Sequence, residues 1–238
     1  MITLLDLTSP DPAENLAWDE ALLLHAEQSG GPEVLRLWES PEPAVVLGAG
    51  GSVDQDVHLG HCQHDRVPVL RRASGGGTVL LGPGCLCFSL VLRYDRHPAL
   101  SDIRASFSYV LQRIVDALAP TVQLQLQESD LVWQDRKVSG NAQQRKRHFL
   151  LHHGTLLYAA DVAAYARYLL EPARQPAYRR QRPHGQFVAN LPLRAAELRN
   201  RLIQAWEAVT GYDPATVLPI VHRLMSDKYA CSSWHFRR

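Results

Sequence analysis

Short apolar runs bounded by turn residues, together with runs in which apolar and polar residues alternate, occupy much of the chain, and both predict β-strands. Successive side chains of a strand point to opposite faces, so an alternating run buries one face against a core. The runs are "EVLRLWE", "AVVLG", "VPVLRR", "CLCFSLVLRY", "TVQLQLQ", "DLVWQDRKVSG" and "HFLLHHGTLLY". Between the third and fourth runs, "ASGGGTVLLGPG" indicates a loop or hairpin, and the polar stretch "GGSVDQDVHLGHCQHDR" indicates a loop with a short helix.

Apolar residues spaced three or four apart predict helices elsewhere. In "PDPAENLAWDEALLLHAEQSGG", Asp11 can cap the first turn, Pro12 can occupy it, and the glycines after Ser29 can end the helix. The other predicted helices are "DIRASFSYVLQRIVDALAP", "DVAAYARYLL", "PLRAAELRNRLIQAWEAVTG", closed by Gly211, and a short one in the tail. The segment 171–188 is rich in arginine and proline and is predicted to be a loop.

The order of these elements indicates the fold class. Strands cluster in the middle of the chain, and helices occur at several points without strict alternation of strand and helix. We find no internal repeat, low-complexity segment or interdomain linker. This pattern predicts one α+β domain over residues 1–238, with a mixed, mostly antiparallel sheet and flanking helices.

Composition narrows the class of protein. The net charge of +1 gives no case for an extended nucleic-acid surface. No apolar run approaches the roughly 18–20 residues that span a bilayer, and the N-terminus has no basic region typical of a signal peptide. The four cysteines include no C-x-x-C pair. We therefore expect a cytoplasmic protein without nucleic-acid or membrane partners.

The stretch "RRASGGGTVLLGPG" is the first candidate for chemistry. Three consecutive glycines, Gly75 to Gly77, let the backbone approach a ligand, and Arg71 and Arg72 beside them suit an anion such as a phosphate. A flexible hairpin loop explains the same residues. The stretch is not a Walker loop, because no Gly-Lys-Ser/Thr follows, and it is not a dinucleotide fingerprint, because a strand rather than a helix comes next.

Lys137 is the second candidate. The chain has only three lysines, the others being Lys146 and Lys228, and it uses arginine at other basic positions. Lys137 precedes a Val-Ser-Gly turn, and its compact ammonium can touch a carboxylate and a phosphate together. A solvated turn lysine is the ordinary alternative, but the scarcity of lysine favours a functional role.

Histidines form two further groups. His152 and His153 are adjacent on a predicted strand, so at most one of them faces a site and a metal-binding pair is not expected. A hydrogen-bonded histidine near a strand end explains this group equally well. The stretch "HLGHCQH" gathers possible zinc ligands, but their spacing matches no common zinc finger. Those residues are His58, His61, Cys62 and His64.

Several of these stretches together resemble the lipoate–protein ligase family, within the wider biotin/lipoate ligase superfamily. The resemblance rests on "RRASGGGTV", "CLCFSLVL" and "SDLVWQDRKVSGNAQQRKRHFLLHHGTLLY". The stretches "NLAWDEALL", "LRLW", "VVLG", "ANLPL" and "DKYACSSWHF" occur in the expected order, so essentially the whole chain is covered. The resemblance implies that lipoate or octanoate reacts with ATP and Mg²⁺ to form an acyl-adenylate. The acyl group then passes to a lysine of a lipoyl carrier domain.

The resemblance also implies roles for particular residues. Lys137 would bind the acyl carbonyl and the adenylate phosphate, and Asp130 would lie near the nucleotide or a magnesium ion. Trp38 and Leu70 would form the wall of an apolar tunnel. The other implied lipoyl or adenylate contacts are Arg71, Arg72, Ser74, Gly75, Gly76, Gly77, Thr78, Val138, Ser139, Gly140, Asn141, His153, Gly154 and Thr155. Arg179, Arg180 and Arg182 would belong to a lid over the adenylate, although a solvated basic loop would look the same.

The chain departs from the family pattern in two places. The His-Asp pair that often follows the glycine loop is replaced by "VLLGP", and the chain ends about where the catalytic domain should stop. We therefore expect either a separate accessory-domain protein as a second partner or an enzyme that acts alone.

Other functions on the same fold are weaker candidates. An octanoyl or lipoyl transferase needs a nucleophilic cysteine, and the corresponding stretches "QLQESDLVW" and "LLEPARQPAY" have none. Cys85 and Cys87 are better explained as small core residues. Biotin ligases carry a Gly-Arg-Gly-Arg type of loop in place of "RRASGGG", and an inactive scaffold subunit would not need Lys137.

Overall fold

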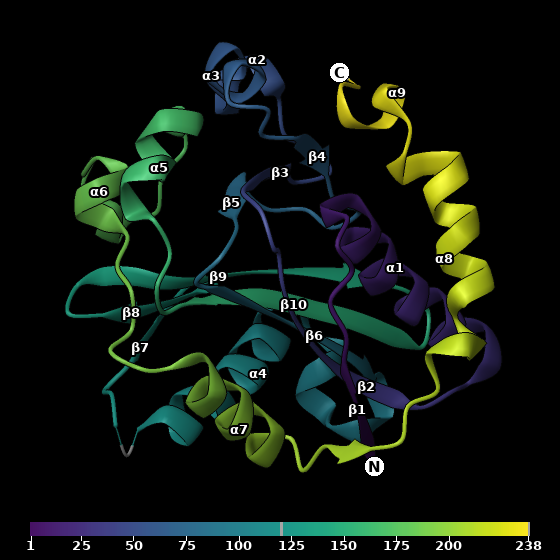
Figure 1. Ribbon diagram of the computed structural model, residues 1–238. Helices are drawn as coiled ribbons and strands as arrows, with labels where there is room; N and C mark the ends of the chain where they lie inside the picture. The colour runs from purple at the N-terminus through teal and green to yellow at the C-terminus, as the bar shows by residue number, and fades with distance from the viewer. Residues whose placement is uncertain (120, 238) are drawn as a thin grey trace.

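The computed structural model describes residues 1–119 and 121–237, and it is built around a mixed sheet of eight strands (Figure 1). The strand order is β11-β1-β2-β6-β10-β9-β8-β7. Strand β1 runs parallel to β2 and β11, and the other neighbours are antiparallel, so the predicted mixed, mostly antiparallel sheet is confirmed. The strands are β1 (Ile2–Asp6), β2 (Glu33–Glu39), β6 (Cys85–Arg93), β7 (Gln125–Gln127), β8 (Asp130–Trp133), β9 (Arg136–Arg145), β10 (Phe149–Leu157) and β11 (Val209–Thr210).

A second sheet of three strands lies above the large one (Figure 1). It consists of β3 (Ala44–Leu47), β4 (Val69–Arg71) and β5 (Val79–Leu81). The central strand β3 pairs in parallel with β4 and antiparallel with β5. The glycine stretch joins β4 to β5, so this small sheet holds both ends of the loop.

Helices cover both faces of the large sheet. They are α1 (Pro12–Ser29), α2 (Val53–Asp56), α3 (Leu59–His64), α4 (Ile103–Leu118), α5 (Val162–Tyr168), α6 (His184–Phe187), α7 (Ala195–Ala205), α8 (Leu218–Leu224) and α9 (Ser232–His235). Short 3₁₀ turns occupy Tyr94–Arg96, Pro98–Ser101, Ala177–Arg179 and Pro214–Thr216, and a π-turn occupies Met225–Tyr229. Within the described residues, no helix combines the length and apolar content needed to cross a lipid bilayer.

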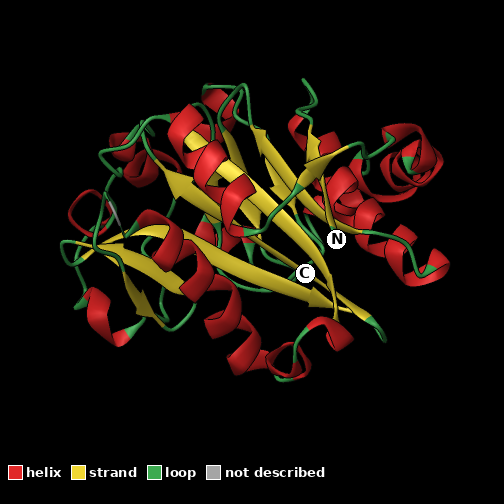
Figure 2. Ribbon diagram, turned by 90° about the horizontal axis from the view of Figure 1, so that it is seen from below, coloured by secondary structure: helices red, strands yellow, loops and turns green. Residues whose placement is uncertain are grey.

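Two hydrophobic cores lie on opposite faces of the large sheet. On one face α4 and α7 pack against it, and Figure 2 shows helices in front of the strands when this face is seen from below. On the other face α1, α8 and the small sheet enclose the second core. Strand β2 serves both, because Leu35 and Leu37 face α4 and α7 while Val34 and Trp38 face α1.

Helix α1 is tied to the sheet by polar contacts as well as by its apolar face. As predicted, Asp11 caps it by accepting a hydrogen bond from the Ala13 N–H at 2.8 Å, and Gly30 ends it with φ of +64°. The fully buried Arg36 of β2 donates to Asp19 Oδ1 and to Asn15 Oδ1, each at 2.7 Å. Breaking such a buried pair on one side costs about 3–5 kcal/mol, so α1 is held firmly in place.

The structure corrects several sequence-based boundaries. The helix predicted to end at Gly211 stops at Ala205, and Val209–Thr210 instead pairs with β1 as a parallel edge strand. Strand β1 itself was not predicted, and the polar stretch after β3 contains two short helices, not one. Strands of two to five residues are too short to carry a clear periodic signal, and their pairing depends on other segments of the chain.

Candidate functional site

The glycine loop is pressed against the end of β3. A Cβ atom on Gly48 would lie 2.0 Å from the Gly76 carbonyl oxygen, so no side chain fits there. Gly76 has φ of +87°, a conformation that L-residues rarely adopt, and its position lies beside Ala142 of β9. Glycines at these positions therefore let the loop backbone lie between β3 and β9.

The buried Arg72 shapes this loop from inside. Its guanidinium donates to the carbonyl oxygens of Gly75 at 2.6 Å and Gly77 at 2.9 Å, and its Nε donates to Ser74 Oγ at 3.0 Å. Burial lowers the pKa of Arg72 to about 10, so the group is still a cation at neutral pH. Arg72 therefore places a positive charge at the loop. Its N–H groups also set the conformation of the loop backbone.

Arg71 has a different set of partners. It is 1% exposed and points at backbone carbonyls of two distant segments. Its Nη1 donates to Gly51 O at 2.7 Å, its Nη2 to Arg237 O at 3.0 Å, and its Nε to Trp234 O at 3.2 Å. The structure therefore places Arg71 as a clamp that holds the C-terminal segment against β4, and its donors face protein carbonyls.

Lys137 lies on β9 and faces the same side of the sheet as the glycine loop. Its Nζ is 2.9 Å from Asp130 Oδ1, and the lysine side chain is 28% exposed. The lysine stem crosses Gly140, where a Cβ atom would be 3.0 Å from both Cε and Nζ of Lys137. The absence of a side chain at Gly140 therefore makes room for the ammonium.

A β-bulge aims Lys137 in this direction. Leu131 pairs with Ser139, but the next residue of β8, Val132, pairs with Lys137, so Val138 is the extra residue. Strict alternation would put Lys137 and Gly140 on opposite faces. Because of the bulge, Lys137 shares its face with Gly140 and the loop, while Val138 belongs to the core below the sheet.

Ser139, Asn141 and Gly154 form a supporting group beneath this face. Asn141 donates to Ser129 O at 2.8 Å and to Ser139 Oγ at 3.1 Å. A Cβ on Gly154 would lie 1.9 Å from Asn141 Oδ1, so the glycine makes room for the amide. These side chains point away from the Lys137 ammonium, whereas Thr155 Oγ1 lies on its face and accepts from the Gly140 N–H at 3.4 Å.

The two adjacent histidines point to opposite faces, as their alternation predicts. His153 Nε2 is 2.6 Å from Ser74 Oγ of the glycine loop. Burial, with the positive charge of Arg72 as a second cause, lowers the pKa of His153 to about 3, so it is a neutral hydrogen-bonding group. His152 stacks on Phe88 in the other core.

A cavity of about 10 Å³ lies behind Ser74 and His153. It is lined by Leu16, Asp19, Glu20, Arg72, Ala73, Ser74, Gln144, Leu151, His153 and Tyr229. The predicted tunnel residues Trp38 and Leu70 are buried in the same core between α1 and the two sheets. The cavity lies between α1, which contributes Leu16 and Glu20, and the face of the large sheet, which contributes Leu151.

The arginine-rich segment 171–187 covers the Lys137 end of β9. It contains a 3₁₀ turn and the short helix α6, although a loop was predicted. Arg179 bonds Glu171 within the segment, Arg182 donates to Asp135 O at 2.8 Å, and Arg180 is exposed near the Asp135 carboxylate. The predicted lid arginines thus bind partners within the segment and in the β8–β9 turn.

The sequence motifs did not indicate a role for Tyr178 of this segment. Its phenol donates to Asp130 Oδ2 at 2.6 Å, on the carboxylate that also holds Lys137. The available signal was that Tyr178 is the only tyrosine among the arginines of this segment. Proximity to Asp130 is a tertiary contact that no local pattern encodes.

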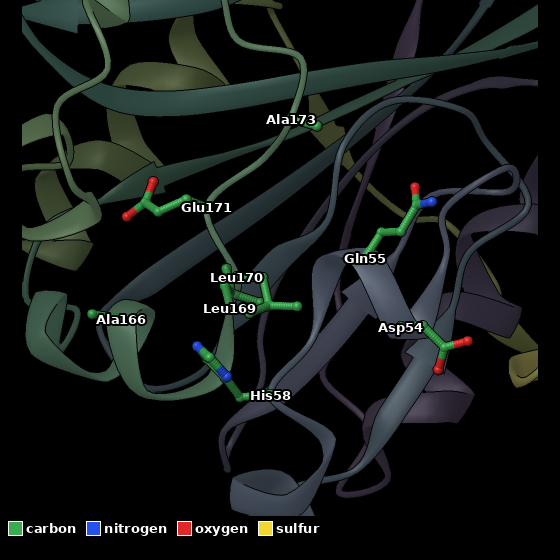
Figure 3. Close-up of a pocket in the computed structure, with 8 residues that line it drawn as sticks. All are labelled: Asp54, Gln55, His58, Ala166, Leu169, Leu170, Glu171 and Ala173. Atoms are coloured by element: carbon green, nitrogen blue, oxygen red, sulfur yellow. The ribbon is translucent and has the colours of Figure 1, made fainter.

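A larger depression of about 680 Å³ lies beside the start of segment 171–187 (Figure 3). Asp54 and Gln55 form one wall and Glu171 lies across from them, with His58 near Leu169 and Leu170. The Leu170 N–H donates to Asp56 O at 3.0 Å, and Asp56 Oδ2 accepts from Thr78 Oγ1 at 2.8 Å. The start of the segment is thereby connected to the glycine loop through α2.

The structure also bears on the alternatives of a cysteine nucleophile and a bound metal ion. Cys85 and Cys87 are buried in β6, and burial raises the pKa of the Cys87 thiol well above its usual range, which disfavours a thiolate. Among the residues that the structure describes, no group of three or more His, Cys, Asp or Glu side chains could hold a metal ion. A magnesium ion at Asp130 would compete with Lys137 and Tyr178 for the carboxylate.

Solved structures of lipoate ligases share this fold and identify the chain's structural class. A bipartite lipoate protein ligase from Thermoplasma acidophilum superposes with a TM-score of 0.83 at 23% identity, covering 98% of this chain and 95% of that one. A lipoate-protein ligase A bound with ATP superposes with a TM-score of 0.83 at 22% identity, covering 98% of both chains.

Sequence comparison shows the family. Residues 11–205 match the lipoyl protein ligase A/B catalytic domain, and the chain belongs to that family. A "Probable lipoate-protein ligase A" from Mycoplasma pneumoniae is 30% identical over 167 residues, which is 68% of this chain and 48% of the relative. The chain thus spans about half the length of that curated relative. The resemblance to lipoate–protein ligases seen in the sequence motifs is confirmed.

Proposed function

We propose that this protein is an ATP-dependent lipoate–protein ligase. It would join lipoate or octanoate to AMP, releasing pyrophosphate, and then transfer the acyl group to a lysine of a lipoyl carrier domain. The observation that carries the proposal is the position of the Lys137 ammonium, which the bulge and Gly140 direct to the face shared with the glycine loop.

The chemistry of adenylation needs a cation in that position. A carboxylate attacks a triphosphate, so two anions must approach each other, and a fixed cation offsets their repulsion. The ammonium of Lys137 has three N–H donors, and Asp130 accepts one of them. The remaining two are available for an acyl oxygen and a phosphate oxygen, each such charged hydrogen bond contributing about 1.5–3 kcal/mol.

The glycine loop supports the same step. Its backbone is free of side chains at Gly75 to Gly77, and Arg72 holds it from below with a cationic group. A nucleotide phosphate beside this loop would meet backbone N–H groups in a positive field. An acyl chain would extend from there toward Trp38, Leu70 and the core under α1.

Partners and setting are part of the proposal. The T. acidophilum relative is a bipartite ligase described with its E2 lipoyl domain, and it supports a lipoyl domain as acceptor and a separate accessory protein as a second partner. ATP as co-substrate is supported by the relative bound with ATP. We take residues 1–238 as one catalytic domain that works in the cytoplasm, with Mg²⁺ entering on ATP.

The test is an assay of the purified chain with lipoate, Mg-ATP and an apo lipoyl domain, with and without a candidate accessory protein. We expect pyrophosphate release and a mass increase of the lipoyl domain by one lipoyl group. Acylation from an acyl-carrier thioester without ATP, and no pyrophosphate under either condition, would instead identify an acyltransferase. Binding of the lipoyl domain with no turnover from either donor would identify a scaffold protein.

A further inference from the structure

The carboxylate of Asp130 is held at both oxygens by side chains from different segments. Oδ1 lies 2.9 Å from Lys137 Nζ on the neighbouring strand, and Oδ2 accepts a hydrogen bond of 2.6 Å from the Tyr178 phenol. Asp130 is only 7% exposed. A buried carboxylate held at one oxygen could rotate, whereas one held at both has a single orientation.

Tyr178 is suited to the donor role. Burial and the negative charge of Asp130 raise the pKa of its phenol above the usual range, so it stays protonated and can donate. Its ring packs at a tilt on Phe187, with centroids 5.2 Å apart. The hydroxyl therefore projects from a fixed aromatic group.

The segment that carries Tyr178 is fastened close to Lys137. The Ala189 N–H donates to the Lys137 carbonyl oxygen at 2.9 Å, and Arg136 donates to the Gly185 carbonyl oxygen at 2.9 Å. Arg182 reaches the β8–β9 turn at Asp135 O. The segment is thus anchored on the backbone beside the lysine, and Tyr178 is its contact with the lysine's counter-ion.

We infer that Tyr178 is a positioning residue for Lys137. Its hydroxyl fixes Asp130, and Asp130 in turn fixes the direction of the ammonium, so the seating of segment 171–187 and the placement of the lysine are coupled. The catalytic consequence rests on the proposed ligase function. The positional consequence does not, because the reactivity of Lys137 toward a small reagent depends only on its contacts and its shielding.

The test compares Tyr178→Phe with the unaltered protein by chemical labelling of lysines. Phenylalanine keeps the ring on Phe187 and removes only the hydroxyl. The protein is treated with acetic anhydride at low ratio and cleaved after arginine, which isolates Lys137 in the peptide 137–145 and Lys228 in the peptide 224–237. Lys228 is the internal reference. It lies in a different part of the fold, where its Nζ is 2.7 Å from Glu20 Oε2.

We expect labelling of Lys137 relative to Lys228 to rise about tenfold in Tyr178→Phe, because one hydrogen bond to a charged acceptor is lost. Tyr168→Phe is the matched control. It also removes a phenol that donates to an aspartate, Asp65, at 2.9 Å, but no lysine is paired there. Its labelling ratio should equal that of the unaltered protein. An unchanged ratio in Tyr178→Phe, with the fold intact by circular dichroism, would overturn the inference.

A double-mutant cycle shows whether Tyr178 acts through Asp130. In an Asp130→Asn background the further change of Tyr178 to phenylalanine should have little additional effect on labelling. The same tenfold rise in that background would mean that the tyrosine acts only on the segment, and the inference would be wrong. In the ligase assay we expect kcat for adenylation to fall several-fold with KM for ATP within about twofold. If the unaltered protein shows no ligase activity, the proposed function fails while the labelling result still decides the role of Tyr178.

Discussion

Replacing Gly140 by alanine perturbs the Lys137 ammonium with a single methyl group. The new Cβ would lie 3.0 Å from both Cε and Nζ of Lys137, closer than carbon and nitrogen atoms normally approach. The lysine end is flexible and 28% exposed, so it can move aside at little cost in folding. Gly140 does not adopt a left-handed backbone conformation, so alanine fits the strand without strain.

The expected magnitude follows from that displacement. Relief of the contact moves the ammonium by several tenths of an ångström to about 1 Å, and misplacement of a catalytic group by about 1 Å can cost on the order of 100-fold in rate. We therefore expect adenylation to slow by roughly 10- to 100-fold. The free energy of unfolding should change by less than about 1 kcal/mol, because a β-strand accepts alanine and no buried polar group loses its partner.

The assay is pyrophosphate release with saturating lipoate and Mg-ATP, paired with urea unfolding of the same preparations. Gly60→Ala is the matched control, because nothing lies within 4 Å of a Cβ there and Gly60 is in α3, outside the site. Its adenylation rate should match that of the unaltered protein. Full activity in Gly140→Ala would refute the idea that the ammonium acts from its position over this glycine.

Three further outcomes follow from other parts of the structure. Lys137→Ala should reduce adenylation below detection with a near-unchanged circular dichroism spectrum, and retained pyrophosphate release would refute the site assignment. Arg71→Met should lower the free energy of unfolding by at least about 3 kcal/mol, because several buried carbonyls lose their donor. Limited proteolysis of this variant should remove the C-terminal segment first. A protease-resistant C-terminus would count against the role of Arg71 as a clamp. Burial lowers the pKa of His152 from its usual 6.5 to about 3, so this group's contribution to stability is present above pH 6.5 and is lost as pH falls toward 3. His152→Phe should make the decline of unfolding free energy between pH 6 and 4 shallower by up to about 1.4 kcal/mol per pH unit, and an unchanged slope in urea titrations would contradict this.

Local signals in the sequence predicted much of the fold. Helix α1 begins at its aspartate cap and ends at glycine as predicted, because capping hydrogen bonds and φ preferences act within a few residues. Short apolar runs marked β2, β6 and β10, and the two-residue period of a strand placed His152 and His153 on opposite faces. The short strands β1 and β11 were not predicted. Strand β1 is held by its pairing with β2 and β11, and β11 pairs with β1 from the other end of the chain, so neither depends on a pattern of its own.

The sequence by itself also singled out Lys137 and the glycine run, since scarcity of lysine and loss of side chains are properties of the chain alone. Only the tertiary structure decided where these groups point. The bulge at Val138 turns Lys137 to the face of the loop, Arg71 binds the C-terminal carbonyls, and Tyr178 reaches Asp130 across 48 residues of sequence. Local patterns record which residue is polar or small, but the contacts of a charged side chain depend on burial and on partners that are brought close only when the whole chain folds.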